Sequence, residues 1–474
     1  MPECRNISVT LRSYHYPDLL MEALKRLGGK LVLLALVFTL ANCRKTSRED
    51  YQKAAANPDY LHGAEKKLTD VMVHDIFSPV VASRIYMYAN LAAYEALVPE
   101  HSGYQSLAGQ LNGLDSIPQP EKGQQYCHPV ASLKAFMTVA RSLTFSVEKY
   151  DDFEKNLFEQ YADMVPGDVY ERSVQYGEAV GKRIMAYSAG DNYKQTRGFR
   201  FTLTQKEGDW APTPPAYMDA VEPYWGKIRC LTMDSTAQFA LASPPPFSKD
   251  KNSVFFKEMA EVYETAGKLT EEQNHIANFW DCNPFKVNVS GHVNFATKKM
   301  SPGGHWISIV GTVAQQEKLD LMRATEAYCL TSIALFDGFI ACWSDKYRTV
   351  KIRPETAINK YMDKDWIPLL QTPPFPEYPS GHSVISSASA VVLTQLLGDN
   401  IAYTDSTEVQ YGIPARRFLS FNHAAAEAGL SRLYGGIHFR SAVVEGAKQG
   451  TQVGHWVNKK LRTRKMLAIK PVKE

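Results

Sequence analysis

Apolar residues recur at the spacing of an α-helix over most of this chain, and the alternation typical of β-strands is scarce. The pattern is clear in HDIFSPVVASRIYMYANLAAYEAL (74–97) and in YERSVQYGEAVGKRIMAYSA (170–189). A chain of 474 residues is long enough to bury a large core and to form more than one helical bundle. We therefore expect an all-α fold of two packed helical bundles.

An irregular, proline-rich connection divides the helical pattern. Residues 198–246 contain WAPTPPAYMDAVEPYWGKIRC and ASPPPF, in which neither helix nor strand periodicity persists. We place an N-terminal helical region at 67–246 and a C-terminal helical domain at 247–474. Residues 44–66 are rich in charged and polar side chains and are interpreted as a polar tether.

The first 43 residues resemble a bacterial lipoprotein signal with an upstream extension. A basic segment ends at Lys30 and precedes an apolar run, 31–41, that is too short to span a bilayer. Cys43 follows this run at the position of the cleavage site. We expect 1–43 to be a signal peptide and Cys43 to be acylated, which predicts a periplasmic or cell-surface protein held to the membrane by an N-terminal lipid anchor.

Charge and cysteine content exclude several other classes. The net charge is +3 and no long basic run occurs, so nucleic acid is not an expected partner. Only Cys4 and Cys43 precede the five remaining cysteines, none of which forms a CxxC pair. Neither a zinc cluster nor a dense disulfide framework is expected from this spacing, although one disulfide of unassigned pairing is possible.

Three short motifs in the second half of the chain supply fixed cations, a helix start and two histidines. The motifs are K-x6-RP, PSGH and SR-x5-H, and their residues are Lys346, Arg353, Ser380, Gly381, His382, Arg432 and His438. Ser380 is expected to cap a helix that runs from about 382 to 397 and ends at Gly398. Arginine forks, a lysine and the amides of a helix N-terminus together suit a tetrahedral oxyanion.

In this order and spacing, the three motifs resemble those of the superfamily of vanadium-dependent haloperoxidases and phosphatidic-acid-type acid phosphatases. WAPTPPAY…PYWGKI and SPGGHW are also similar to segments of bacterial haloperoxidase-like proteins. The resemblance covers most of the chain after its leader and implies the helical haloperoxidase and acid-phosphatase fold.

The resemblance also implies roles for individual residues. It places the ligands of the bound vanadate on Lys346, Arg353, Ser380, Gly381, Arg432 and His438. It implies that His438 binds the vanadium atom itself and that His382 acts as the acid–base catalyst. Lys346 is implied to be a third catalytic residue. Trp343 and Phe375 match the aromatic wall of the chloroperoxidase-type site. The implied activity is oxidation of a halide by hydrogen peroxide.

Two other functions remain open at this point. An acid phosphatase would use the same residues without vanadate, with His438 as the nucleophile and His382 protonating the leaving group of a phosphate ester. A surface-anchored protein that binds an anion or glycan without turnover is the third reading. The haloperoxidase is favoured because lipid phosphatases of the superfamily usually carry several membrane spans and because of Trp343 and Phe375.

One position departs from the family pattern. The family often has an aspartate four residues after the second histidine, where it orients the imidazole. Here that residue is Ala442, so we expect His438 to be oriented by Glu445 or by a backbone carbonyl. His305, in SPGGHW, is interpreted as a buried structural histidine.

Overall fold

The computed structural model describes residues 47–290, 293–296 and 298–465, and it is 58% helix and 3% strand. The expected all-α fold is therefore confirmed. The helices are α2 (Arg48–Ala55), α3 (Asp59–His74), α4 (Pro79–Leu97), α5 (His128–Leu143), α6 (Asp151–Met164), α7 (Gly167–Ala189), α8 (Tyr193–Thr196), α9 (Val254–Ala266), α10 (Glu271–Phe279), α11 (Pro302–Gln316), α12 (Leu321–Thr349), α13 (Pro354–Tyr361), α14 (Gly381–Leu397), α15 (Phe421–Tyr434) and α16 (Arg440–Lys460). Short 3-10 turns are η1 (Val98–Glu100), η2 (Val147–Tyr150), η3 (Trp225–Lys227) and η4 (Val409–Tyr411).

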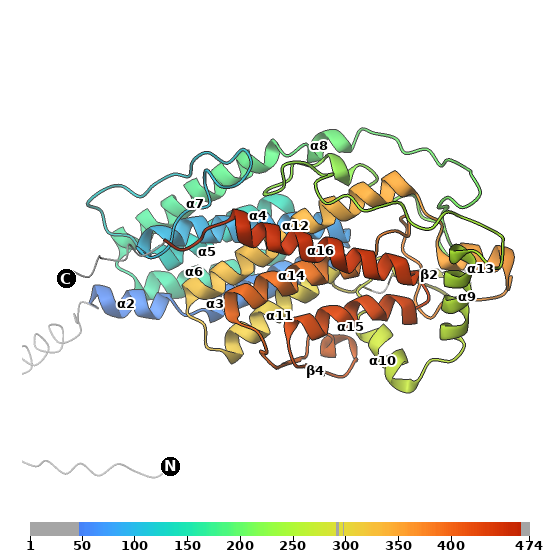
Figure 1. Cartoon of the computed structure of the whole chain (residues 1–474). Helices are drawn as coiled ribbons and strands as arrows, with labels where there is room; N and C mark the ends of the chain where they lie inside the picture. The colour runs from blue at the N-terminus through green and yellow to red at the C-terminus, as the bar shows by residue number, and fades with distance from the viewer. Residues whose placement is uncertain (1–46, 291–292, 297, 466–474) are drawn as a thin grey trace, which may run out of the picture. The chain divides into compact units, whose positions relative to one another are not determined.

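The long helix α12 forms the centre of the core. Asp320 caps its start by accepting a hydrogen bond from Arg323 N at 2.8 Å, and it ends where Val350 adopts a left-handed φ of 48°. Among the described residues, α12 is the one helix that is long and apolar enough to cross a membrane. However, 94% of its most apolar 18-residue stretch is buried inside the protein. Figure 1 shows why: other helices enclose it on several sides, and it packs against α4, α11, α14 and α16.

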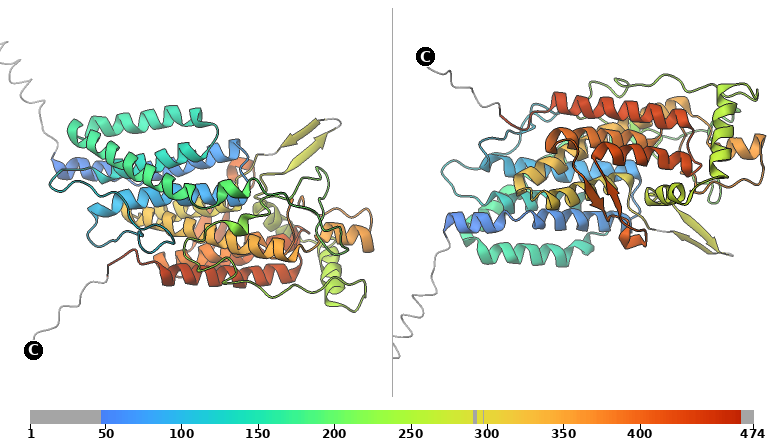
Figure 2. Two further views of the ribbon diagram at one scale, coloured as in Figure 1. Left: turned by 90° about the horizontal axis from the view of Figure 1, so that it is seen from above. Right: turned by 60° about the horizontal axis from the view of Figure 1, so that its bottom comes forward.

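Two groups of helices meet at α12. Helices α4, α5 and α7 pack together on one side, and α14, α15 and α16 pack together on the other, as the views in Figure 2 show. The contact between α4 and α12 joins the two groups into one core. Every residue of α4 is buried in this core. The boundary at 246/247 stays a prediction.

Glycines let α14 and α16 approach backbone to backbone. A Cβ on Gly450 would lie 2.0 Å from Val384 O, and one on Gly446 would lie 2.9 Å from Ser380 O. Side chains at these positions would force the two helices apart. The register of α16 against α14 therefore fixes where the first turn of α14 lies.

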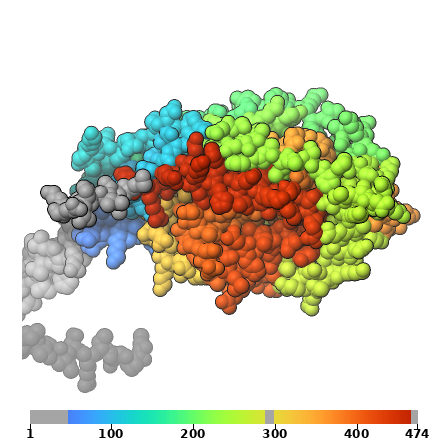
Figure 3. Space-filling model, in the orientation of Figure 1, coloured from blue at the N-terminus to red at the C-terminus, as the bar shows by residue number. Residues whose placement is uncertain are grey.

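The remaining chain covers this helical core. Residues 198–246 form the irregular connection that the sequence predicts, with η3 as its helical turn. In Figure 3 the orange and red C-terminal helices fill the middle of the visible face, and green segments border its top and one end. Two antiparallel pairs, β1 (Val287–Ser290) with β2 (Val293–Ala296) and β3 (Tyr403–Asp405) with β4 (Arg416–Phe418), are the strands of the described residues.

The prediction of a polar tether at 44–66 is wrong for most of its length. Helix α2 begins at Arg48 and α3 begins at Asp59, and Leu61 and Ala64 are fully buried. The few apolar residues of this charged segment are spaced so that one helical face meets the core. The predicted signal at 1–43, including Cys43, lies outside the described residues. The five cysteines that the structure describes are buried and free.

Candidate oxyanion site

The N-terminus of α14 is capped by the serine that the sequence predicts. Ser380 Oγ accepts a hydrogen bond from Ser383 N at 3.3 Å, and the helix runs from Gly381 to Leu397. Ser380 N donates to Ala442 O of α16 at 3.0 Å, which holds the helix start against its neighbour. The amides of the first turn carry the positive end of the helix dipole, so this point attracts an anion.

Three cations, Lys346, Arg353 and Arg432, lie beside this helix start, and each is 2% exposed or less. They come from α12, from the residue that precedes α13, and from α15. Among the described residues, none of the three has a carboxylate within ion-pair distance. Burial lowers the pKa of Lys346 to about 7 and that of Arg353 to about 10, and it also lowers the pKa of Arg432. Since buried unpaired charge is costly, an anion bound among them stabilises the site.

Backbone carbonyls hold the cations in place. Lys346 Nζ donates to the carbonyls of Pro376, Glu377 and Pro379 at 2.9, 3.1 and 2.5 Å, so all three of its protons reach the segment before α14. The two arginines are held by carbonyls in the same way. Arg353 Nε and Nη1 donate to Phe375 O and Ile437 O, both at 2.9 Å, and Arg432 Nη1 donates to Trp280 O at 2.7 Å.

The arginines keep donors that the protein does not use. Arg353 Nη2 and Arg432 Nε are buried and have no hydrogen-bond partner among the described residues. Buried guanidinium N–H groups are normally satisfied, and leaving one unpaired costs stability. These orphaned donors therefore indicate that the site binds an acceptor from outside the chain.

His438 is oriented by Glu377, which the sequence interpretation missed. His438 Nδ1 lies 2.9 Å from Glu377 Oε1, and Arg353 Nη1 donates to His438 Nε2 at 3.2 Å. A guanidinium has no acceptor, so Nε2 carries the lone pair and Nδ1–H donates to Glu377. Burial, and then Arg353, hold the pKa of His438 well below its ordinary value, so the imidazole is neutral. Its Nε2 is thus in the form that binds an electrophilic centre.

The expectation that Glu445 or a carbonyl orients His438 is wrong. Glu445 is paired with Lys448 at 2.6 Å on the outer side of α16. Ala442 is fully buried, and its carbonyl accepts from Ser380 N. The missing aspartate therefore does not leave the imidazole without a partner, because the carboxylate comes from the segment that precedes PSGH.

His382 is the second residue of α14 and lines the same cavity as His438. Its Nε2 is buried without a hydrogen-bond partner in the described part of the chain. Burial, and then the charge of Arg432, lower the pKa of His382 well below its ordinary value. At neutral pH this imidazole is therefore uncharged in the anion-free protein.

A cavity opens over the helix start. Its walls combine two histidines, one arginine and one asparagine with mostly apolar side chains. The lining residues include Cys282, Asn283, Phe285, Phe339, Trp343, Phe375, Gly381, His382, Arg432, Ile437 and His438. Trp343 and Phe375 contact each other with ring centroids 4.9 Å apart, so both predicted wall residues do lie at the cavity. A Cβ on Gly381 would point toward Trp343 at 3.5 Å and fill part of this space.

The structure thus brings the predicted residues to one place. Gly381, His382, Arg432 and His438 line the cavity. Arg353 contacts His438, and Ser380 caps the helix at the cavity floor. Lys346 lies behind the PSGH segment with its protons on carbonyls, so its direct contact with an anion stays a prediction.

These residues fit vanadate or another tetrahedral oxyanion. The donor set is cationic and amide-rich, two arginine donors are orphaned, and Gly381 leaves room beside the first amides of α14. His438 Nε2 carries the lone pair of the imidazole, which accepts a hydrogen bond from Arg353 Nη1 and would exchange that bond for one to the bound group.

The chain is similar to known proteins in sequence and in fold. A family model described as the VCPO second helical-bundle domain matches residues 326–465. The crystal structure of the first bacterial vanadium-dependent iodoperoxidase is 44% identical, with a TM-score of 0.82, and the match covers 86% of this chain and 98% of that one. A comparison with curated proteins finds no match.

Bacterial vanadium-dependent chloroperoxidase shares the fold at lower identity. Its holo-type crystal structure is 18% identical with a TM-score of 0.62, and the match covers 81% of this chain and 93% of that one. The apo-type structure gives 17% identity and a TM-score of 0.61, with 81% of this chain and 95% of that one covered.

Proposed function

This chain belongs to the vanadium-dependent haloperoxidases, and from that membership we propose that it oxidises iodide with hydrogen peroxide through a bound vanadate. Halide oxidation with vanadate as cofactor follows from the family itself. Iodide is the finer proposal, and it is supported by the 44% identity to a vanadium-dependent iodoperoxidase. The observation that carries the activity is the group of three buried cations without a carboxylate partner beside the start of α14, one of which, Arg353, contacts His438 Nε2.

Each part of the site would hold vanadate by a different interaction. His438 would bind vanadium through Nε2, because Glu377 fixes the proton on Nδ1. The orphaned donors of Arg353 and Arg432 would reach its oxygens, and Lys346 would add charge from behind. Ser380 and the amide of Gly381 would donate at the helix start. When bound, vanadate supplies a Lewis-acidic centre that activates peroxide for oxygen transfer to halide.

The chain's own contribution to the chemistry is charge stabilisation and proton transfer. The cations stabilise negative charge that develops on oxygen, and they are already fixed by carbonyls, so little reorganisation is needed. His382 takes the proton of hydrogen peroxide on its unpartnered Nε2 and returns one to the departing oxygen. Overall, peroxide, halide and one proton give hypohalous acid and water.

The cavity wall favours a weakly hydrated halide. Apart from Asn283, His382, Arg432 and His438, most lining side chains are apolar or aromatic, so a halide that enters loses much of its hydration. Iodide is the largest of the common halides and holds its water least tightly, so it loses the least on entry. Trp343 and Phe375 offer polarisable faces to it.

The direct test titrates vanadate into the metal-free protein and follows oxidation of iodide, bromide and chloride by peroxide. We expect vanadate-dependent turnover with iodide as the preferred halide. Equal or faster turnover of bromide or chloride would overturn the iodide assignment while leaving the family function intact. p-Nitrophenyl phosphate, assayed in parallel without vanadate, tests the phosphatase alternative, which requires ester cleavage through a phosphohistidine at residue 438.

We also propose that the protein is a lipoprotein of the periplasm or the cell surface. The support is the basic segment that ends at Lys30, the apolar run at 31–41 and Cys43. The test is cell fractionation of the wild-type chain and of Cys43→Ala. The wild-type protein should partition with membranes and carry label from a fatty acid, and the variant should lose the label. Unlabelled wild-type protein in the soluble fraction would contradict the proposal.

A further inference from the structure

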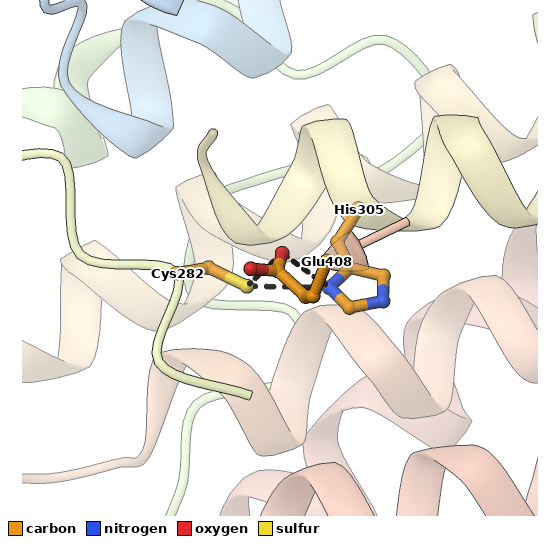
Figure 4. Close-up of side chains that lie close together, drawn as sticks. All are labelled: Cys282, His305 and Glu408. Carbon is orange, nitrogen blue, oxygen red and sulfur yellow. Dashed lines mark hydrogen bonds and ion pairs between the residues drawn. The ribbon is translucent and has the colours of Figure 1, made fainter. Parts of the chain in front are cut away.

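A second group of chemically active side chains lies beside the cavity. Figure 4 shows Cys282, His305 and Glu408 pointing toward one another from three separate segments. Cys282 follows α10, His305 belongs to α11, and Glu408 lies between β3 and η4. Cys282 Sγ is 3.3 Å from His305 Nδ1 and 3.9 Å from Glu408 Oε1, and the last two atoms are 3.4 Å apart.

Two of these spacings match the edges of a tetrahedral metal site, and the third, from Cys282 Sγ to Glu408 Oε1, is a few tenths of an ångström wider. With Zn–S near 2.3 Å and Zn–N or Zn–O near 2.0–2.1 Å, the ligand atoms of such a site lie about 3.3–3.6 Å apart. We propose that Cys282, His305 and Glu408 bind a divalent cation of the zinc class, with the fourth position left to water. Thiolate, imidazole and carboxylate are the ligands that zinc takes in proteins.

His305 is already held in the orientation that a metal ligand needs. Its Nε2 lies 2.7 Å from Asp405 Oδ2, so Nε2–H donates to the carboxylate, and Nδ1 faces Cys282 and Glu408, where a metal would take the place of a proton. A carboxylate behind a ligating histidine is the usual support of a zinc site. The ring of Trp280 stacks on the imidazole with centroids 4.6 Å apart, which fixes the ring plane.

The charge balance at Glu408 supplies an independent reason for a cation. Glu408 and Asp405 are fully buried, and within the described part of the chain no lysine or arginine lies within ion-pair distance of either. Glu408 Oε2 is buried without a hydrogen-bond partner there. The neighbouring Asp281 is paired with lysines. His305 lies within ion-pair distance of both carboxylates, so the two acids share one imidazole, and a divalent cation would compensate the negative charge that remains.

A metal at this point would tie together the elements that form one wall of the cavity. Cys282 and Phe285 line the cavity, and Trp280 O accepts the hydrogen bond from Arg432. Binding would therefore fix the 280–285 segment against α11 and would hold Arg432 in place. The metal site does not depend on the proposed function, because its occupancy can be measured in protein that holds no vanadate.

The test is metal analysis of the full-length protein produced with zinc and dialysed against metal-free buffer. We expect about one zinc per chain, since a preformed buried site retains its metal. Cys282→Ser and Glu408→Gln should each retain less than about a tenth of that amount. Cys230→Ser removes another buried cysteine and should retain the full equivalent.

Cobalt binding provides a spectroscopic test of the same site. Co²⁺ added to metal-free wild-type protein should give the near-ultraviolet charge-transfer band of a thiolate ligand, and Cys282→Ser should lack it. Asp405→Asn should keep the band but bind cobalt about 10–100-fold more weakly. Wild-type protein that retains no zinc and shows no thiolate band would overturn the proposal. So would zinc retention that Cys282→Ser and Glu408→Gln leave unchanged.

Discussion

Glu377 Oε1 lies 2.9 Å from His438 Nδ1, although the two residues are 61 positions apart in the chain. The same oxygen accepts a hydrogen bond from Phe439 N at 2.9 Å, so one buried carboxylate fixes both the imidazole and the backbone that carries it. The aspartate that the family often places on the helix after the histidine is replaced by a carboxylate from the segment that precedes α14.

Replacing Glu377 should therefore weaken vanadate binding. Glu377→Gln keeps the side-chain size but offers His438 a neutral acceptor, so we expect about 10–100-fold lower vanadate affinity, as for other partners of metal-bound histidines. The measurement is the vanadate concentration at half-maximal iodide oxidation. Glu445→Gln is the matched control and should change nothing, because Glu445 pairs with Lys448. The opposite ranking of the two variants would contradict the assignment.

The lowered pKa of Lys346 leads us to expect that anion binding depends on pH. Burial lowers its pKa to about 7, so the anion-free protein loses this positive charge as the pH rises above 7. Sulfate keeps its charge across pH 6–9, and its affinity should fall by up to about tenfold per pH unit above 7. His382 and His438 stay neutral over this range, because burial lowers the pKa of each.

The control for this experiment is Lys346→Met, which cannot titrate. Calorimetric titration of sulfate should give a weak affinity for this variant that is flat from pH 6 to 9. A wild-type affinity that does not change between pH 6 and 9 would show that Lys346 keeps its proton throughout.

The contact between α14 and α16 predicts a large effect on stability. In Gly450→Ala the new Cβ would meet Val384 O at 2.0 Å, so the helices must separate at a cost of about 1–3 kcal/mol or more. Gly63→Ala is the comparison, because its Cβ would make an ordinary contact with Phe153 at 3.5 Å in the middle of α3. We expect it to be neutral or to stabilise by up to about 1 kcal/mol. Urea unfolding of both variants measures the difference, and equal stabilities would contradict the close packing.

Local features of the fold could be predicted from the sequence, because their causes lie within a few residues. Ser380 caps α14 and Gly398 ends it, and the capping box at Thr270 forms as its residue types indicate. The oxyanion motifs were recognisable for the same reason, since each is short and its order along the chain is fixed.

Partners from distant segments could not be predicted. Glu377 is the acidic residue in the proline-rich run PPFPEYPSGH, and no periodicity relates it to His438. The group of Cys282, His305, Asp405 and Glu408 spans 126 positions of the chain, so it has none of the short spacings that identify a metal site in a sequence. His305 was interpreted as a structural histidine, and it is buried, but its partners become visible only when α11 packs beside the β3 segment.

Replacing His438 and replacing His382 should impair different properties of the enzyme, namely vanadate retention and the rate of turnover. His438 is the proposed vanadium ligand, so His438→Ala should lose vanadate on dialysis. His382→Ala leaves the cations and His438 in place, so it should keep vanadate but oxidise iodide roughly 10²–10⁴-fold more slowly, the usual cost of losing a positioned acid–base group. Vanadium analysis after dialysis, together with steady-state rates at saturating vanadate, separates the two effects. In a phosphatase the same His438→Ala variant would instead lose a trapped phosphohistidine while Arg353 and Arg432 still held phosphate. Retention of vanadate by His438→Ala and its loss by His382→Ala would reverse the roles that the positions of Glu377 and Arg353 assign to the two imidazoles.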